Sequence, residues 1–143
     1  MPRIYLDSCI VIYLLEGPMD LSRSIRSALD PVAGDTPSAC FSELTRLECR
    51  VGPMRKGAKQ VLRKFDEFFM SDDLENLPID PRTFDLATRI RALQGAKTAD
   101  AIHLAAAILG GCEEFWTGDN RLKSAAAGKI ETRVFSLAPS LSS

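Results

Sequence analysis

Acidic side chains near the ends of predicted strands and in predicted helices are the residues of this chain that could do chemistry. Asp7 and Asp119 each follow a strand-like segment, and in an open parallel sheet ligands bind beyond the carboxyl ends of the strands. Glu48 and Asp100 lie in helices that we expect to bring them to the same end. Converging carboxylates raise one another's pKa unless a cation compensates. An all-carboxylate cluster suits a hard divalent ion, so the pattern predicts Mg²⁺ or Mn²⁺.

Three of these acids also fit a purely local role, and the residues alone leave that alternative open. Asp7 and Asp119 precede predicted helices, where an Asp serves as N-cap. Asp100 lies two residues beyond Thr98, the predicted cap of its helix, where the helix dipole stabilises an acid. The metal hypothesis therefore depends on the acids meeting at one end of the sheet.

Glu48 lies within the apolar stripe of its predicted helix. It falls four residues after Leu44 and three before Val51, and Leu47 completes the stripe that we expect to face the core. A carboxylate in that position requires a partner, because burying it alone is too costly. The alternative is a place at the edge of the stripe, with the carboxylate in water.

The elements that must position these acids alternate between strands and helices. Strands are predicted over residues 3–6, 39–41, 74–79, 114–117 and 133–137. Helices are predicted over 10–15, from the Ser42 cap to Gly52-Pro53, over 56–70, from Asp80-Pro81 to Gly95 and over 121–127. A further helix runs through Leu21, Ile25 and Leu29 and stops at Asp30-Pro31. Another begins at the Thr98 cap and ends at Gly110-Gly111, and we expect its Ala99, Ile102, Ala106 and Leu109 to point inward. This alternation predicts an α/β fold with a mostly parallel central sheet covered on both faces.

Length and composition indicate one globular domain. The chain has 143 residues, 45% of them hydrophobic, and a formal net charge of −1. We expect a single domain over 1–137 and a Ser-rich tail over 138–143. Four cysteines without a Cys-x-x-Cys pair and a single histidine argue against structural zinc and suit a reducing cytoplasm. The clean apolar run Cys9–Leu15 has only seven residues, too few to span a bilayer, so no membrane association is expected.

Four segments that carry the acids follow a family pattern in their order and spacing. They are Ile4–Ser8, Ser42–Arg50, Thr98–Ala107 and Thr117–Leu122. The sequence resembles a PIN domain, most closely the VapC-type ribonuclease toxins of type II toxin-antitoxin systems. The resemblance covers nearly the whole chain and implies a three-layer α/β/α fold.

The resemblance also assigns residue roles. It implies that Asp7, Glu48, Asp100 and Asp119 hold the catalytic metal, with Thr117 in a supporting polar role. Two positions depart from the family pattern: Cys9 stands where many relatives have Ser or Asn, and Arg121 stands where some have a further acid. The second departure leaves a second metal ion in doubt.

The reaction implied is metal-dependent endoribonuclease cleavage. A metal held by the four carboxylates would lower the pKa of a bound water and stabilise charge on a phosphate oxygen during in-line hydrolysis. Ser8 and Thr117 could orient that water or a ligand, although Ser8 equally fits a local capping hydroxyl. We expect His103, one turn beyond Asp100, to serve packing or support rather than to act as general base.

Charge is strongly segregated along the chain. Residues 46–64 hold seven basic side chains and one acid, whereas residues 66–85 hold one basic side chain and seven acids. The basic segment lies next to Glu48, so an RNA strand could follow it. The residues that we expect to touch RNA are Arg46, Arg50, Lys59 and Arg63. The alternative is an ordinary solvated helix face.

Partners are implied mainly by the resemblance. VapC-type toxins are usually homodimers held by a small VapB-like antitoxin whose C-terminal segment covers the active site. Independently, four converging acids would attract an arginine. Helices 10–15 and 61–69 are candidates for antitoxin or dimer contacts, although most of their side chains also fit the core of the monomer.

Other functions explain the residues less well. The alternative of another class is a PIN-like module that binds RNA or protein without cutting. A phosphotransferase with an aspartate nucleophile would need a second Asp two residues after Asp7, where Cys9 stands.

Overall fold

A computed structural model describes residues 2–30 and 38–136 of the chain. Five strands form one sheet in the order β3-β2-β1-β4-β5, and every pairing is parallel. Their bounds are β1 (Arg3–Leu6), β2 (Ser38–Ser42), β3 (Leu74–Leu77), β4 (Glu114–Thr117) and β5 (Glu131–Val134). Central strands of a parallel sheet are apolar on both faces, which explains why Ile4, Tyr5 and Leu6 in β1 are all buried.

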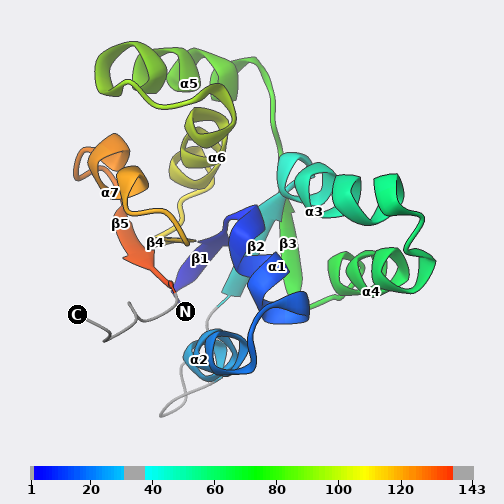
Figure 1. The fold of residues 1–143 in the computed structure, drawn as a ribbon. Helices are drawn as coiled ribbons and strands as arrows, with labels where there is room; N and C mark the ends of the chain where they lie inside the picture. The colour runs from blue at the N-terminus through cyan, green and yellow to red at the C-terminus, as the bar shows by residue number, and fades with distance from the viewer. Residues whose placement is uncertain (1, 31–37, 137–143) are drawn as a thin grey trace, which may run out of the picture.

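Helices cover both faces of the sheet, as Figure 1 shows. Their bounds are α1 (Ser8–Glu16), α2 (Met19–Leu29), α3 (Glu43–Lys56), α4 (Lys59–Phe69), α5 (Pro81–Gln94), α6 (Thr98–Leu109) and α7 (Arg121–Ala126). The predicted α/β architecture with a parallel central sheet is confirmed. None of the helices in the described part of the chain combines the length and the apolar character needed to cross a membrane.

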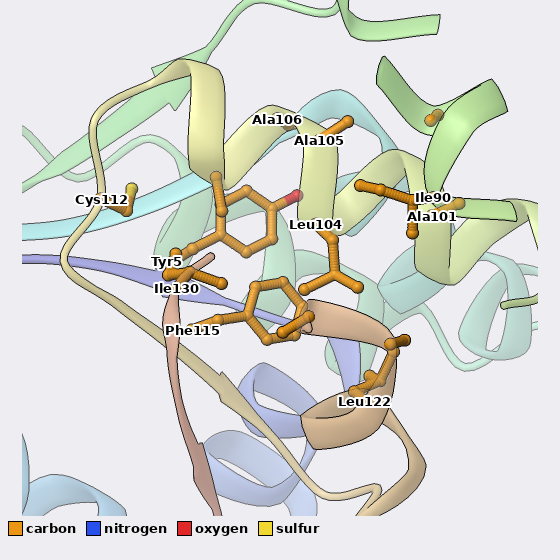
Figure 2. Packing of buried hydrophobic residues seen from close by; sticks show 14 of the residues in the cluster. Tyr5, Ile90, Ala101, Leu104, Ala105, Ala106, Cys112, Phe115, Leu122 and Ile130 are labelled. Atoms are coloured by element: carbon orange, nitrogen blue, oxygen red, sulfur yellow. The ribbon is translucent and has the colours of Figure 1, made fainter. Parts of the chain in front are cut away.

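The two faces of the sheet carry separate cores. On one face, Tyr5 and Phe115 stack at 5.3 Å between ring centroids beneath the alanine-rich helix α6 and its neighbours α5 and α7 (Figure 2). On the other face, Leu6 and Trp116 pack with side chains of α1, α2 and α4. Alternate residues of β1 and β4 thus serve opposite cores, which places these two strands at the centre of the fold.

Helix α3 ends later than predicted. The helix continues through Gly52-Pro53 to Lys56, so the expected stop was wrong, and α4 begins at Lys59 rather than at Lys56. The actual stop is Gly57, whose φ of 68° is left-handed and whose N–H bonds to the carbonyl groups of the last turn. Pro53 lacks the N–H group that would donate to the preceding turn, but it does not end the helix. It stands in the last turn of α3, and its carbonyl still accepts a hydrogen bond from the Ala58 N–H at 2.9 Å.

The predicted inner face of α3 was also wrong. Leu47 is 57% exposed and Val51 is 47% exposed, whereas Thr45 and Cys49 are buried. The Thr45 hydroxyl accepts from the Ser42 backbone N–H at 3.2 Å and lies 3.2 Å from the Tyr5 hydroxyl. These polar contacts turn the small side chains of the helix toward the core and leave its larger apolar side chains outside.

Smaller differences concern the ends of elements. Strand β3 ends at Leu77 instead of residue 79, and β5 covers Glu131–Val134 instead of 133–137. Leu109, expected to point inward, is exposed at the end of α6. Thr98 was predicted to cap α6, but it is the first residue of that helix. The N-cap position is Lys97, whose side chain makes no capping hydrogen bond. Pro31 and the tail 138–143 lie outside the described residues.

Candidate active site

The four predicted acids line one cavity at the carboxyl end of the sheet. Asp7 follows β1, and Asp119 lies two residues beyond Thr117, the last residue of the adjacent strand β4. Helix α3 contributes Glu48 and helix α6 contributes Asp100. The cavity measures about 590 Å³ and is lined by Asp7, Ser8, Cys9, Tyr13, Glu48, Asp100, Gly118, Asp119, Asn120, Arg121 and Leu122. The structure thus brings together the acids that the sequence separates by more than a hundred residues.

Asp7 is the most buried of these acids, with only 6% of the residue exposed. Its Oδ1 accepts from the Ser8 backbone N–H at 2.8 Å, which makes it the N-cap of α1. Its Oδ2 accepts from the Thr117 hydroxyl at 2.8 Å and from the Cys9 thiol at 3.5 Å. The local capping role therefore holds, and it coexists with a place in the cavity because several donors orient the carboxylate.

Glu48 is half-buried, and its partner is His103. The imidazole Nε2 lies 2.5 Å from Glu48 Oε1 and 3.5 Å from Asp7 Oδ1. Burial pushes the pKa of Glu48 upward, but the hydrogen bond with His103, together with a further electrostatic contribution from that ring and the Ser8 hydroxyl, outweighs burial and holds that pKa below its ordinary value. Ligand atoms of Asp7, Glu48 and His103 all lie within 4.8 Å of one another, a spacing that could hold a metal ion.

Asp100 is half-buried and carries an unfavourable charge. Burial, followed by repulsion from Asp7, raises the pKa of Asp100 above its ordinary value, and Asp119 and Glu48 add to that repulsion. Only His103 acts in the opposite direction among the groups that shift this pKa. A carboxylate in this state is stabilised by a bound cation. The oxygen-rich donor set and the electrostatics of Asp100 therefore fit a hard divalent ion.

Asp119 already has a cationic partner. The Arg121 guanidinium binds its carboxylate through Nη2 at 2.6 Å and through Nε at 3.0 and 3.1 Å, and the Arg121 backbone N–H adds a bond of 2.9 Å. The Arg121 side chain lowers the pKa of Asp119. The N-cap position of α7 belongs to Asn120. Arg121 thus places a positive charge beside the acids.

Two small side chains, Ser8 and Cys9, line the cavity, and a third, Thr117, lies buried behind it. Thr117 is fully buried and joins two acids, because its hydroxyl donates to Asp7 and accepts from the Asp119 backbone N–H at 3.2 Å. Ser8 lines the cavity beside Glu48. Burial and the nearby charge of Asp7 raise the pKa of Cys9 to about 12. The Cys9 thiol therefore stays protonated and serves as a hydrogen-bond donor rather than as a nucleophile.

The basic side chains predicted to touch RNA lie outside this cavity. Arg50 bonds to Asp66 of α4 at 2.8 Å, and Arg46 lies 3.8 Å from Glu43. Lys59 and Arg63 are exposed on α4. The structure leaves these four side chains on the surface of the α3–α4 pair and does not bring them to the acids.

A second, apolar cavity adjoins the acidic one. It measures about 310 Å³ and lies between α1, α3 and α4, with a wall formed by Ile12, Glu16, Glu48, Cys49, Gly52, Pro53, Lys56, Ala58, Val61 and Phe65. Glu48 lines both cavities. We call this second cavity the apolar groove. The shared residue places one end of the groove next to the acidic cavity.

Comparison with protein families matches residues 4–128 of the chain to the PIN domain. The chain belongs to the PIN domain family. That match covers all four acids of the cavity, β1 from Ile4 onward, and all of β2, β3 and β4. No curated protein matches the chain significantly by sequence.

Several solved structures share the fold of this PIN domain. VapBC2 from Rickettsia felis, bound to a DNA fragment from its promoter, superposes with a TM-score of 0.73 at 14% identity, covering 93% of this chain and 98% of that one. A toxin-antitoxin complex from Klebsiella pneumoniae gives 0.68 at 21% identity, covering 89% and 94%. VapBC-1 from nontypeable Haemophilus influenzae gives 0.66 at 16% identity, covering 92% and 97%. At these identities the likeness establishes the fold.

Sequence patterns indicate a packing or supporting role for His103 but do not reveal its contacts with Tyr5 and Glu48 in this PIN domain. One signal was present, because His103 follows Asp100 by three residues and therefore shares its face of α6. The contact between His103 and Glu48 joins residues 55 positions apart, and no local pattern reveals it. The Arg121–Asp119 pair was accessible from sequence, since the two residues are only two positions apart.

Proposed function

We propose that this PIN domain is a metal-dependent endoribonuclease and the toxin of a toxin-antitoxin pair. The observation that carries the proposal is the convergence of Asp7, Glu48, Asp100 and Asp119 on one open cavity. Asp7 and Glu48 are held there by hydrogen bonds from Thr117 and His103. The toxin-antitoxin complexes that share the fold support the second half of the proposal.

The metal would be Mg²⁺ or Mn²⁺, held by the four carboxylates. Such an ion activates a bound water and stabilises the charge that develops on the phosphate during in-line hydrolysis. The residues of the chain contribute orientation: Thr117 fixes Asp7, and Ser8 offers a hydroxyl at the cavity wall for a water or a phosphate oxygen. Arg121 brings a permanent cation to the same wall, which favours a single metal ion over two.

The substrate proposed is RNA, guided by the basic surface of α3 and α4. Lys59 and Arg63 are exposed and would bind phosphates directly. Arg46 and Arg50 are partly neutralised by Glu43 and Asp66, so they would contribute less. Because the acids repel phosphate, such a cationic surface is needed to hold an RNA strand near the cavity.

The partner proposed is a VapB-like antitoxin whose C-terminal segment lies in the apolar groove. The groove offers an apolar floor that includes Ile12, Val61 and Phe65, and it reaches the acidic cavity at Glu48. An apolar segment followed by an arginine would fit both cavities, since a guanidinium pairs bidentately with a carboxylate. The proposal includes a homodimer, because Leu47, Val51 and Met54 form an exposed apolar stripe on α3 that a second copy would cover.

A cleavage assay tests the nuclease half. Purified protein is expected to cut RNA with Mg²⁺ or Mn²⁺ and to stop when EDTA is added, while Asp7→Asn should remain folded and lose cleavage. Asp72→Asn, on the exposed side of the molecule, is the matched control. Cleavage by Asp7→Asn at the wild-type rate would exclude these acids, and tight RNA binding without any cleavage would favour the non-cleaving module.

Expression tests the toxin half. Production of the protein alone is expected to arrest growth, and coexpression with the adjacent small open reading frame should relieve the arrest. Light scattering of the purified complex reports whether two copies are present. Normal growth together with a monomer lacking any copurified protein would contradict the toxin and its partner but leave the nuclease chemistry standing.

A further inference from the structure

A buried chain of polar side chains leads from the core to the acids. The Tyr5 hydroxyl lies 2.7 Å from Ser42 Oγ and 3.2 Å from Thr45 Oγ1, and it also lies 2.7 Å from Nδ1 of His103. The other ring nitrogen of His103 contacts Glu48 and Asp7. Residues from β1, the start of α3, and α6 are thereby connected to the cavity wall through one imidazole.

The chemistry of the end groups favours one direction for these bonds. Ionised carboxylates accept hydrogen bonds and cannot donate them, so Nε2 of His103 must carry the proton that faces Glu48 and Asp7. In the tautomer that carries its proton on Nε2, Nδ1 is an acceptor for the Tyr5 O–H. Burial raises the pKa of Tyr5, which keeps that hydroxyl protonated and able to donate.

Packing alone does not require this arrangement. His103 is only 1% exposed and lies among the buried alanine and leucine residues of α6, where an apolar side chain would fill the space without desolvating a polar ring. The Tyr5 and His103 rings meet edge to face at 5.6 Å between centroids, so the tyrosine also limits rotation of the imidazole. Because the His103 ring is held at both nitrogens, its Nε2 is fixed in position and can orient the carboxylates of Glu48 and Asp7.

We propose that His103 is a positioning residue that holds the carboxylates of Glu48 and Asp7 in the arrangement needed for the metal, and that Tyr5 holds the imidazole. This inference rests on the proposed function, because it concerns the same acids. Outer hydrogen-bond partners of metal ligands usually change metal affinity or activity by about 10- to 100-fold when they are removed. In this tautomer His103 acts as a hydrogen-bond donor to the acids rather than as a metal ligand, since Nε2 carries its proton and Nδ1 faces Tyr5.

The single histidine of the chain makes the bond directions measurable. In ¹⁵N-labelled protein freed of any purification tag, both imidazole nitrogen signals belong to His103 without mutagenesis. At neutral pH the spectrum is expected to show a protonated Nε2 that persists when diamagnetic Mg²⁺ saturates the protein. If Nε2 loses its proton on Mg²⁺ addition, His103 is a ligand and the inference is overturned.

Variants test the positioning itself through Mn²⁺ affinity measured by calorimetry. His103→Leu is expected to weaken Mn²⁺ binding about 10- to 100-fold and to lower kcat while leaving KM for RNA near its wild-type value. His103→Gln keeps an N–H near the position of Nε2 and should recover most of the affinity. Tyr5→Phe keeps the ring, removes the hydroxyl and should give a smaller loss. Thr132→Val, which removes a buried hydroxyl on β5, is the control and should leave the affinity unchanged.

The outcomes separate this inference from the proposed function. Wild-type Mn²⁺ affinity in folded His103→Leu overturns the positioning role even when cleavage is intact. If His103→Leu does not fold, Tyr5→Phe decides in its place, and an unchanged affinity and kcat in that variant overturns the inference. A wild-type protein that binds no Mn²⁺ and cuts no RNA overturns the proposed function, and with it the need for positioning.

Discussion

The Thr117 hydroxyl donates a hydrogen bond of 2.8 Å to Asp7 Oδ2, between the ends of the neighbouring strands β4 and β1. Both residues are buried, so the bond is shielded from water. Because Thr117 also accepts from the Asp119 backbone N–H, one hydroxyl sets the separation of two acids that different strands contribute.

Removing that hydroxyl should impair the site more than the fold. Thr117→Val keeps the shape of the side chain but leaves Asp7 one donor short, so we expect cleavage to fall about 10- to 100-fold. A bond to a charged group contributes about 1.5–3 kcal/mol, which should appear as a lower melting temperature. Thr117→Ser keeps the hydroxyl and is the control. Equal cleavage by the Val and wild-type proteins would show that the bond is dispensable.

Asp100 should lower the stability of the metal-free protein. Its pKa is raised in the folded state, so its contribution to stability is greatest below the unfolded pKa and is lost as the pH rises through the folded pKa. Asp100→Asn is therefore expected to melt at a higher temperature than wild type at pH 7 in EDTA, while losing cleavage. Added Mg²⁺ should raise the melting temperature of wild type more than that of the variant. A variant that melts lower than wild type in EDTA would contradict this electrostatic account.

The contribution of Glu48 to folding stability should depend on pH in the opposite direction. Its folded pKa is lowered, so its contribution to stability is present above the ordinary Glu pKa and is lost as the pH falls through the folded pKa. Glu48→Gln should therefore reduce the melting temperature at pH 7 and flatten its fall in acid. Glu67→Gln, on the exposed side of α4, should change neither. Parallel pH profiles for the Glu48 variant and wild type would refute the stabilising contact with His103.

Arg121 should compete with a metal ion for Asp119. Its guanidinium lies on the carboxylate with bonds as short as 2.6 Å, although the side chain is largely exposed. Arg121→Ala frees the acid, so we expect Mn²⁺ to bind a few-fold more tightly in calorimetry, with the largest difference at low salt. Lys123→Ala on the same helix is the control. Weaker Mn²⁺ binding by Arg121→Ala would show that the arginine supports the site instead.

The exposed basic residues of α4 should bind RNA through phosphates. Replacing Lys59 or Arg63 by Ala should weaken binding and reduce the slope of log affinity against log salt by about 0.7 for each lost contact to a single strand. Arg50→Ala should change the slope less, because Asp66 already neutralises it. Arg89→Ala, on α5, is the control. Identical slopes for all variants would identify the basic segment as a solvated surface.

The sequence predicted the central architecture because the ends of strands and helices are marked by adjacent residues. The apolar run of β1 ends at Asp7, which is both the N-cap of α1 and part of the cavity. The Asp80-Pro81 start and the Gly95 stop of α5 were predicted for the same reason: capping chemistry is readable from adjacent residues. The same signals predicted the succession of strands and helices along the chain.

Long-range polar contacts explain where the predictions were wrong. Counting apolar residues placed Leu47 and Val51 on the inner face of α3, but the bond between Thr45 and Tyr5, forty residues apart, turns that helix otherwise. The partner of Glu48 was missed because His103 comes from another helix. Periodicity measures hydrophobicity along one element and contains no information about hydrogen bonds between elements.

The order of the strands governs when the site exists during synthesis. The acids come from residues 7, 48, 100 and 119, and β4 must pair with β1 before Asp119 can face Asp7. A nascent chain that has emerged only through α6 has no β4 strand and therefore no complete cavity. The site is therefore completed late, after β1, α3 and α6 have all been made.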